Sequence, residues 1–141
     1  MFTRIIEGEV PARFVWRDDS CVAFLNITPL ASGHTLLVPK EQTGHWIDLD
    51  PGLAAHLMFV SQAIGKAVQE GFGPERIGLA IAGLEIPHAH VHVWPIHGPM
   101  SFPIDSDEEE PPEPDWEELE GTAGTIRRAL KDLGFEQHVA D

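Results

Sequence analysis

Residues 87–95 read Pro87-His-Ala-His-Val-His-Val-Trp-Pro95, and this run largely decides how the chain is interpreted. Side chains of two kinds alternate along it, which predicts a β-strand with two chemically different faces. One face would carry three histidines and the other three apolar residues: His88, His90 and His92 against Ala89, Val91 and Val93. Successive imidazoles would then lie roughly 6.6 Å apart. Such crowding disfavours protonation of all three rings, so a partly neutral cluster is expected near neutral pH.

A neutral imidazole nitrogen is a suitable nucleophile for phosphoryl transfer, and its neighbours can stabilise charge on the phosphate oxygens. Two other interpretations stay open from the residues alone. Histidines at alternate positions of a strand can share Zn²⁺, with a third ligand from the remaining imidazole, His34 or Glu85. The run could also be a solvated strand face that is merely rich in histidine.

The segments around this run predict an α+β fold with a mainly antiparallel sheet. β-Favouring runs at 13–18 and 21–27 flank Asp19-Ser20 and predict a hairpin. Residues 34–39 and 76–82 are expected as further strands. Asp50-Pro51 predicts the start of a long helix that Gly71 closes, and helical periodicity returns from Trp116 to Leu133.

Composition and charge narrow the class of protein. The net charge is −14, yet residues 101–120 carry ten acidic and no basic side chains, while residues 1–100 carry ten acidic and six basic ones. We therefore expect a domain at 1–100, an acidic Pro-rich linker at 101–115, and a C-terminal helix and tail at 116–141. The absence of a basic patch argues against nucleic acid as partner. No apolar run is long enough to cross a membrane. A single cysteine, Cys21, and no visible secretory signal predict a cytoplasmic location.

Three ordered stretches resemble the histidine-triad (HIT) family. His88-x-His90-x-His92-Val-Trp is similar to the family signature, and Ala82-Gly-Leu-Glu-Ile-Pro87 is similar to its lead-in. The stretch from Leu25 to Lys40, which includes Ser32-Gly-His34 and Val38-Pro-Lys40, resembles a second family motif. A third match is the opening Ile5-Ile-Glu-Gly-Glu-Val-Pro-Ala-Arg13 followed by Asp18-Asp19.

The resemblance implies a HIT-like fold and a role for each matching residue. His90 would be the nucleophile that forms a covalent nucleotidyl-imidazole, His92 would contact the phosphate, and His88 would orient His90 through its backbone carbonyl. His34 would close the fourth side of the cluster, and Glu85 is a candidate proton donor or a solvated surface acid. Asn26 replaces a family Asp that binds ribose, or serves only as a turn residue. The base pocket would be lined by four apolar residues that could equally be plain core: Phe2, Ile5, Phe24 and Ile27.

The resemblance further implies a small Hint-like hydrolase of purine nucleotide AMP–X compounds such as phosphoramidates, working as a homodimer. No cofactor would be required, no metal is expected at the catalytic site, and a structural or adventitious Zn is the open alternative. Ala82 and Leu84 stand where relatives have polar residues, which leaves a weakened nucleotide-binding protein as one rival function. Hydrolysis of dinucleoside polyphosphates is another, and zinc binding by the histidine cluster is the third. The histidines outside the motifs are expected to be incidental: His45, His56, His97 and His138.

Overall fold

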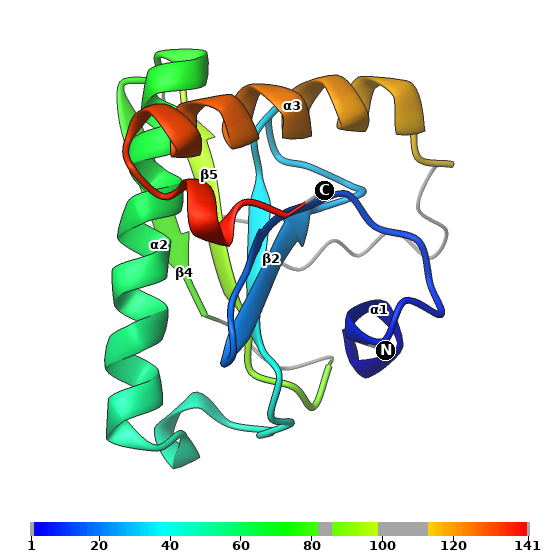
Figure 1. The fold of residues 1–141 in the computed structure, drawn as a ribbon, viewed down its shortest axis with the longest axis vertical. Coiled ribbons are helices and arrows are strands. Elements are labelled where there is room, and N and C mark those ends of the chain that lie inside the picture. The colour runs from blue at the N-terminus through cyan, green and yellow to red at the C-terminus, as the bar shows by residue number, and fades with distance from the viewer. Residues whose placement is uncertain (1, 82–85, 99–112, 141) are drawn as a thin grey trace.

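The computed structural model of this chain describes residues 2–81, 86–98 and 113–140 (Figure 1). Within these ranges five strands form one antiparallel sheet in the order β1-β2-β3-β5-β4. The elements are α1 (Phe2–Ile6), β1 (Phe14–Arg17), β2 (Cys21–Leu25), β3 (Thr35–Pro39), η1 (Trp46–Asp48), α2 (Pro51–Phe72), β4 (Arg76–Ala80), β5 (Val91–Ile96), α3 (Trp116–Asp132) and η2 (Glu136–His138). The predicted α+β fold, with its long helix and C-terminal helix, is confirmed. The two 3-10 helices and α1 were not predicted.

The two faces of the sheet carry different layers, as Figure 1 shows. Alternate residues of the strands, among them Ala23, Leu37 and Val91, join the apolar faces of α2 and α3 in the main core. The residues between them, such as Phe24 and Leu36, pack with α1 in a second apolar cluster. The period-two alternation of the strands therefore separates a helix-covered face from the face that carries the histidines. None of the helices in the described ranges is long and apolar enough to cross a membrane.

The β1–β2 hairpin forms where Asp19-Ser20 predicted it, and Asp18 holds its turn. Oδ1 of Asp18 accepts the backbone N–H groups of Ser20 and Cys21 at 2.8 and 2.9 Å. Oδ2 accepts the indole N–H of Trp16 at 2.9 Å and lies 2.7 Å from Nε2 of His56 on α2. Burial alone would raise the pKa of this carboxyl, but these hydrogen bonds outweigh it and hold the pKa well below its usual range.

Helix α2 begins as predicted, because the Asp50 side chain accepts the N–H groups of Gly52 and Leu53 and Pro51 occupies the first turn. Its predicted end at Gly71 is wrong by a short distance. The helix continues through Phe72, and Gly73 closes it with a left-handed φ of 59°. Gly71 instead lies where α2 meets α3, since a Cβ at this position would be 2.8 Å from Cγ2 of Thr125.

Helix α3 is part of the main core, and Arg127 ties it to β1 and to Ala140. The buried guanidinium donates from Nε to the carbonyls of Phe14 and Ala140 at 2.9 and 2.8 Å. Its NH1 group lies 2.7 Å from Oε1 of Glu120, whose Oε2 pairs with Arg13 at 2.8 Å. These bonds hold the last residues of the chain against β1, where Val139 also bridges to Trp16.

Candidate active site

The histidine run enters the sheet later than its alternation predicted. β5 starts at Val91, so His88 and His90 precede the strand and only His92 lies within it. The pairing of β5 with β3 begins at Val91, opposite Leu37, although β3 itself continues to Pro39. The backbone before β5 bonds to loops instead, with the N–H of Ala89 donating to the carbonyl of Thr43 at 2.7 Å. The predicted strand over 87–95 is therefore wrong for its first half.

The predicted cluster of imidazoles nevertheless forms. The rings of His90 and His92 lie 4.9 Å apart between centroids, and those of His34 and His92 lie 5.2 Å apart. His34 comes from the loop before β3 and meets the others across the β3–β5 pair. All four residues are buried, with exposed fractions of 2% for His34 and His88, 5% for His92 and 7% for His90. This burial argues against the alternative interpretation, in which the run is a solvated strand face that is merely rich in histidine.

Hydrogen bonds fix which nitrogen of His90 carries its lone pair. Nδ1 of His90 lies 2.9 Å from the backbone carbonyl of His88, an acceptor, so Nδ1 carries the proton. In the neutral ring the lone pair is then on Nε2, the nitrogen available for attack. His88 is held in turn by its Nε2, which donates to the carbonyl of Pro39 at 2.7 Å. The geometry matches the predicted orientation of His90 by the carbonyl of His88.

A second chain of bonds sets the protons of His34 and His92. The backbone N–H of Leu30 donates to Nδ1 of His34 at 3.1 Å, so the proton of the neutral ring is on Nε2. That Nε2 lies 3.0 Å from Nδ1 of His92, which must accept. A neutral His92 therefore carries its proton on Nε2. His34 makes His92 a hydrogen-bond donor, which is the form suited to a phosphate oxygen.

The surroundings keep two of these rings uncharged. Burial, and then the neighbouring His92, lower the pKa of His34 from 6.5 to about 3. Burial is also the main cause that lowers the pKa of His88, with His90 adding to it and the bond to the Pro39 carbonyl opposing it. The expected neutral cluster is thus supported for His34 and His88, and burial contributes more than the mutual repulsion that the spacing suggested.

This lowered pKa predicts a loss of stability in acid. Between pH 6.5 and about 3 the unfolded chain binds a proton at residue 34 that the folded protein does not bind. The free energy of unfolding therefore falls as the pH drops through this window and is restored above it. At pH 4.5 the loss from His34 amounts to about 3 kcal/mol. Urea unfolding at pH 7 and 4.5 should show a smaller loss for His34→Asn than for the wild type. The exposed His97→Asn serves as control, and equal losses in all three proteins would contradict the assignment.

Three of the residues predicted to line a base pocket lie together beside the triad, which is the set of His88, His90 and His92. Phe2, Ile5 and Phe24 belong to the second apolar cluster and are buried. The ring of Phe2 meets that of His90 edge-on at 4.9 Å and that of Phe24 at 5.9 Å. These side chains form an apolar wall next to His90, and they pack on one another as core residues do. Their burial agrees with the interpretation as core residues, and binding of a base there stays a prediction.

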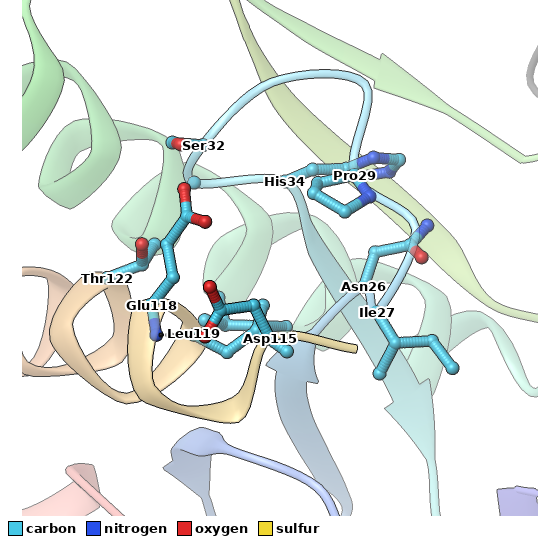
Figure 2. A pocket seen from close by; sticks show the side chains of 11 residues that line it. Asn26, Ile27, Pro29, Ser32, His34, Asp115, Glu118, Leu119 and Thr122 are labelled. Atoms are coloured by element: carbon cyan, nitrogen blue, oxygen red, sulfur yellow. Dashed lines mark hydrogen bonds between the residues drawn. The ribbon is translucent and has the colours of Figure 1, made fainter. Parts of the chain in front are cut away.

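Asn26 and Ile27 lie apart from that wall, in a pocket between the loop before β3 and the start of α3 (Figure 2). Oδ1 of Asn26 accepts both the N–H and the hydroxyl of Thr28, at 2.9 and 3.1 Å, as in the turn that was the alternative interpretation. Ile27 is 41% exposed. The loop side of the pocket also holds Pro29, Ser32 and His34.

Sequence reasoning missed the other wall of this pocket. Asp115, Glu118, Leu119 and Thr122 of α3 and its N-cap line it opposite the loop, as Figure 2 shows. No local sequence pattern in residues 113–122 predicts this contact, because it depends on how α3 packs across the core. Glu85, Ala82 and Leu84 lie outside the described residues, so the position of the candidate proton donor stays a prediction.

The histidines predicted to be incidental have defined structural contacts in three of four cases. His45 caps η1 by accepting the N–H of Ile47 at 3.4 Å, and His56 lies against Asp18. The ring of His138 stacks on Trp16 at 4.8 Å with an interplanar angle of 26°. None of these three joins the triad, and His97 is exposed.

Comparisons with known proteins agree with this geometry. The HIT domain family model matches residues 7–98. An uncharacterised HIT-like protein of Methanocaldococcus jannaschii is 34% identical over 99 residues, which cover 67% of this chain and 77% of the relative. The adenylylsulfatase HINT3 of Arabidopsis thaliana is 31% identical over 100 residues, which cover 67% of this chain and 51% of that protein.

Solved structures extend the likeness to more of the chain. A Hit-like protein of Bartonella henselae matches with a TM-score of 0.75 and 30% identity, over 92% of this chain and 95% of its own. A Zn-bound histidine triad family protein of Mycobacterium smegmatis matches with a TM-score of 0.74 and 28% identity, over 94% and 93%. Coverage this large must include part of the chain beyond residue 98. With four clustered imidazoles on a five-stranded antiparallel sheet, this chain belongs to the HIT family, in its Hint-like branch.

Proposed function

We propose that this protein hydrolyses AMP–X compounds, phosphoramidates among them, through a covalent nucleotidyl intermediate on His90. The observation that carries the proposal is the bond from Nδ1 of His90 to the carbonyl of His88, which leaves the lone pair on Nε2. A buried imidazole held in this tautomer needs no separate base before it attacks phosphorus. The apolar wall of Phe2, Ile5 and Phe24 beside it suits a purine base.

In the first step Nε2 of His90 forms a bond to the α-phosphorus, and the bond from phosphorus to X breaks. X leaves with the electron pair of that bond and takes up a proton, for which Glu85 is the candidate donor. The Nε2–H of His92 donates to a non-bridging phosphate oxygen, where negative charge is concentrated. His34 contributes by keeping Nδ1 of His92 an acceptor, so that the N–H donor of His92 is at Nε2.

In the second step a water oxygen attacks the phosphorus and the bond from phosphorus to Nε2 breaks. The electron pair of that bond returns to Nε2 of His90, the proton that water loses goes to the carboxylate left on Glu85 by the first step, and AMP is released. Throughout, the carbonyl of His88 stabilises the positive charge on the His90 ring, because it accepts the Nδ1–H at 2.9 Å. Neither step requires a metal ion, so activity is expected to survive chelators.

The substrate class is drawn from the branch as well as from the site. The plant relative is named an adenylylsulfatase, and adenylylsulfate is itself AMP joined to a leaving group. Adenosine phosphoramidate, adenylylsulfate and a dinucleoside polyphosphate are therefore the substrates to compare. A preference for the last would support the alternative polyphosphate hydrolase. Calorimetric AMP binding without cleavage of any of them would support the weakened nucleotide-binding protein.

The deciding experiment is to trap the intermediate. The full chain is mixed with an AMP–X substrate, quenched in alkali within one turnover, and digested for mass spectrometry. We expect one adenylyl group on the peptide that contains His90, and none on that peptide from a His90→Gln variant. An adduct on another residue, or rapid AMP release with no adduct at any time, would contradict the proposed mechanism.

We expect the protein to act as a homodimer in the cytoplasm. Among the described residues β4 is an edge strand of the sheet, and an edge strand is a ready site for strand pairing. Leu79, Ile81 and Met58 are 43%, 37% and 60% exposed on β4, just after it and on α2. Light scattering should give a dimer for the wild type and mainly monomer for Leu79→Lys. Leu133→Lys, at a residue 38% exposed beyond α3, should stay dimeric. A monomeric wild type would contradict this expectation.

A further inference from the structure

A second group of chemically reactive side chains lies on the opposite face of the sheet from the triad. Asp18, Cys21 and His56 each place one ligand atom within 4.8 Å of those of the other two. Oδ2 of Asp18 is 2.7 Å from Nε2 of His56 and 3.5 Å from Sγ of Cys21. Cys21 belongs to the main core under α2 and α3, whereas His90 contacts Phe2 of the second apolar cluster. The group is therefore separate from the proposed catalytic site.

The fold holds these three side chains from two independent elements. Asp18 and Cys21 flank the β1–β2 turn, and Oδ1 of Asp18 is fixed by the N–H groups of Ser20 and Cys21. This leaves Oδ2 on the side of the thiol and of His56. His56 comes from α2, which is anchored on the sheet by buried residues next in sequence, among them Leu57 and Val60. The three donors converge because the β1–β2 hairpin and α2 pack against each other in the main core.

The donor set suits a borderline-soft divalent cation. One carboxylate oxygen, one imidazole nitrogen and one thiolate are ligands that Zn²⁺ takes at about 2.0–2.3 Å. In a tetrahedral site such bonds put neighbouring ligand atoms roughly 3.3–3.8 Å apart. The 3.5 Å between Oδ2 of Asp18 and Sγ of Cys21 lies in this range, and the 2.7 Å between Oδ2 and Nε2 of His56 needs only a small side-chain shift to reach it. A cation would take the place of the protons that now join these atoms, as is usual when Cys and His become ligands.

The exposure of the group fits a site that a cation can enter. The Cys21 side chain is fully buried and that of Asp18 is 10% exposed, so two ligands are shielded from water. The His56 side chain is 35% exposed and forms the open side. Three protein ligands with a fourth position open to water are a common arrangement for Zn²⁺. The geometry points to a binding site for a divalent cation of the zinc class at Asp18, Cys21 and His56, which cross-links the β1–β2 hairpin to α2.

Cobalt and zinc titrations of the full chain test this site. After treatment with a chelator, the protein is titrated with Co²⁺, and we expect one equivalent to bind with a thiolate-to-cobalt charge-transfer band. Cys21→Ser should abolish the band, and His56→Gln should weaken binding more than about 100-fold, since even outer-shell partners contribute about 10–100-fold. Zn²⁺ at about one hundred times its dissociation constant should raise Tm by roughly 5–10 °C in the wild type only.

Matched variants separate this site from its rivals. His138→Gln alters a neighbouring histidine that stacks on Trp16 without joining the group, and it should bind Co²⁺ as the wild type does. Circular dichroism melting of the metal-free Cys21→Ser and His56→Gln proteins checks that both are folded. Co²⁺ binding that survives both substitutions and disappears in His92→Gln would place the metal at the triad and overturn the inference. No binding to the wild type would leave the group as a hydrogen-bond network only, which overturns it as well.

Discussion

Replacing His90 with glutamine is expected to lower kcat for AMP–X hydrolysis by about 10⁴-fold or more, because the substitution removes the only atom proposed to bond to phosphorus. Glutamine keeps a polar side chain of similar length beside the His88 carbonyl, so the fold should persist. Steady-state assays with adenosine phosphoramidate measure the loss. AMP binding, followed by calorimetry, should change much less than kcat.

His97→Gln is the matched control, because His97 is exposed and follows the same strand without joining the cluster. Its turnover should equal that of the wild type. If His90→Gln kept more than about a tenth of the wild-type rate, water or another side chain would have to attack the substrate directly. The covalent mechanism would then be wrong, whatever the fold.

Replacing Arg127 with methionine is expected to lower the free energy of unfolding by about 3 kcal/mol or more. The substitution keeps an apolar stem of similar reach but removes the donors for the carbonyls of Phe14 and Ala140. It also leaves Glu120 without its shortest ion pair. Because two of these acceptors belong to β1 and to the end of the chain, we expect the loss to fall on the whole folded unit. Urea unfolding at neutral pH, followed by tryptophan fluorescence, measures it.

Arg128 gives a control of the same chemistry at the adjacent position. It is exposed on α3, so Arg128→Met should change the free energy of unfolding by less than about 0.5 kcal/mol. Equal effects of the two substitutions would show that the loss of charge, rather than the loss of the buried hydrogen bonds, determines stability. In that case the hydrogen bonds of Arg127 to Phe14 and Ala140 would contribute nothing measurable to the free energy of unfolding.

The sequence was informative wherever a local rule decides the outcome. The Asp50-Pro51 cap, the turn at Asp19-Ser20 and the strands expected in 21–27 and 34–39 depend on neighbouring residues alone, and each element formed within those bounds. The predicted helix end at Gly71 was wrong because a glycine can occur where two helices pack closely as well as where a helix ends. Only the contact with Thr125, fifty-odd residues further along in the chain, distinguishes the two.

The site shows the same division between local and distant information. Alternation placed His88 and His90 within a strand, but the backbone there bonds to a loop, since the N–H of Ala89 donates to the carbonyl of Thr43. The role of the His88 carbonyl came from the family resemblance; the structure has the carbonyl within 2.9 Å of Nδ1 of His90, and the role itself stays a prediction. The acids of α3 beside Asn26, and the approach of His56 to Asp18, come from tertiary packing that no short motif records.

Leu119 belongs both to the main core and to the wall of the pocket beside Asn26. That wall can move away from the pocket only if α3 also loses its contacts in the main core. A molecule that enters there therefore meets a fixed shape on the helix side, and any adjustment must come from the loop of residues 26–34. This pocket would therefore select the molecules that bind in it by their fit to the fixed helix side, not by closing that side over them.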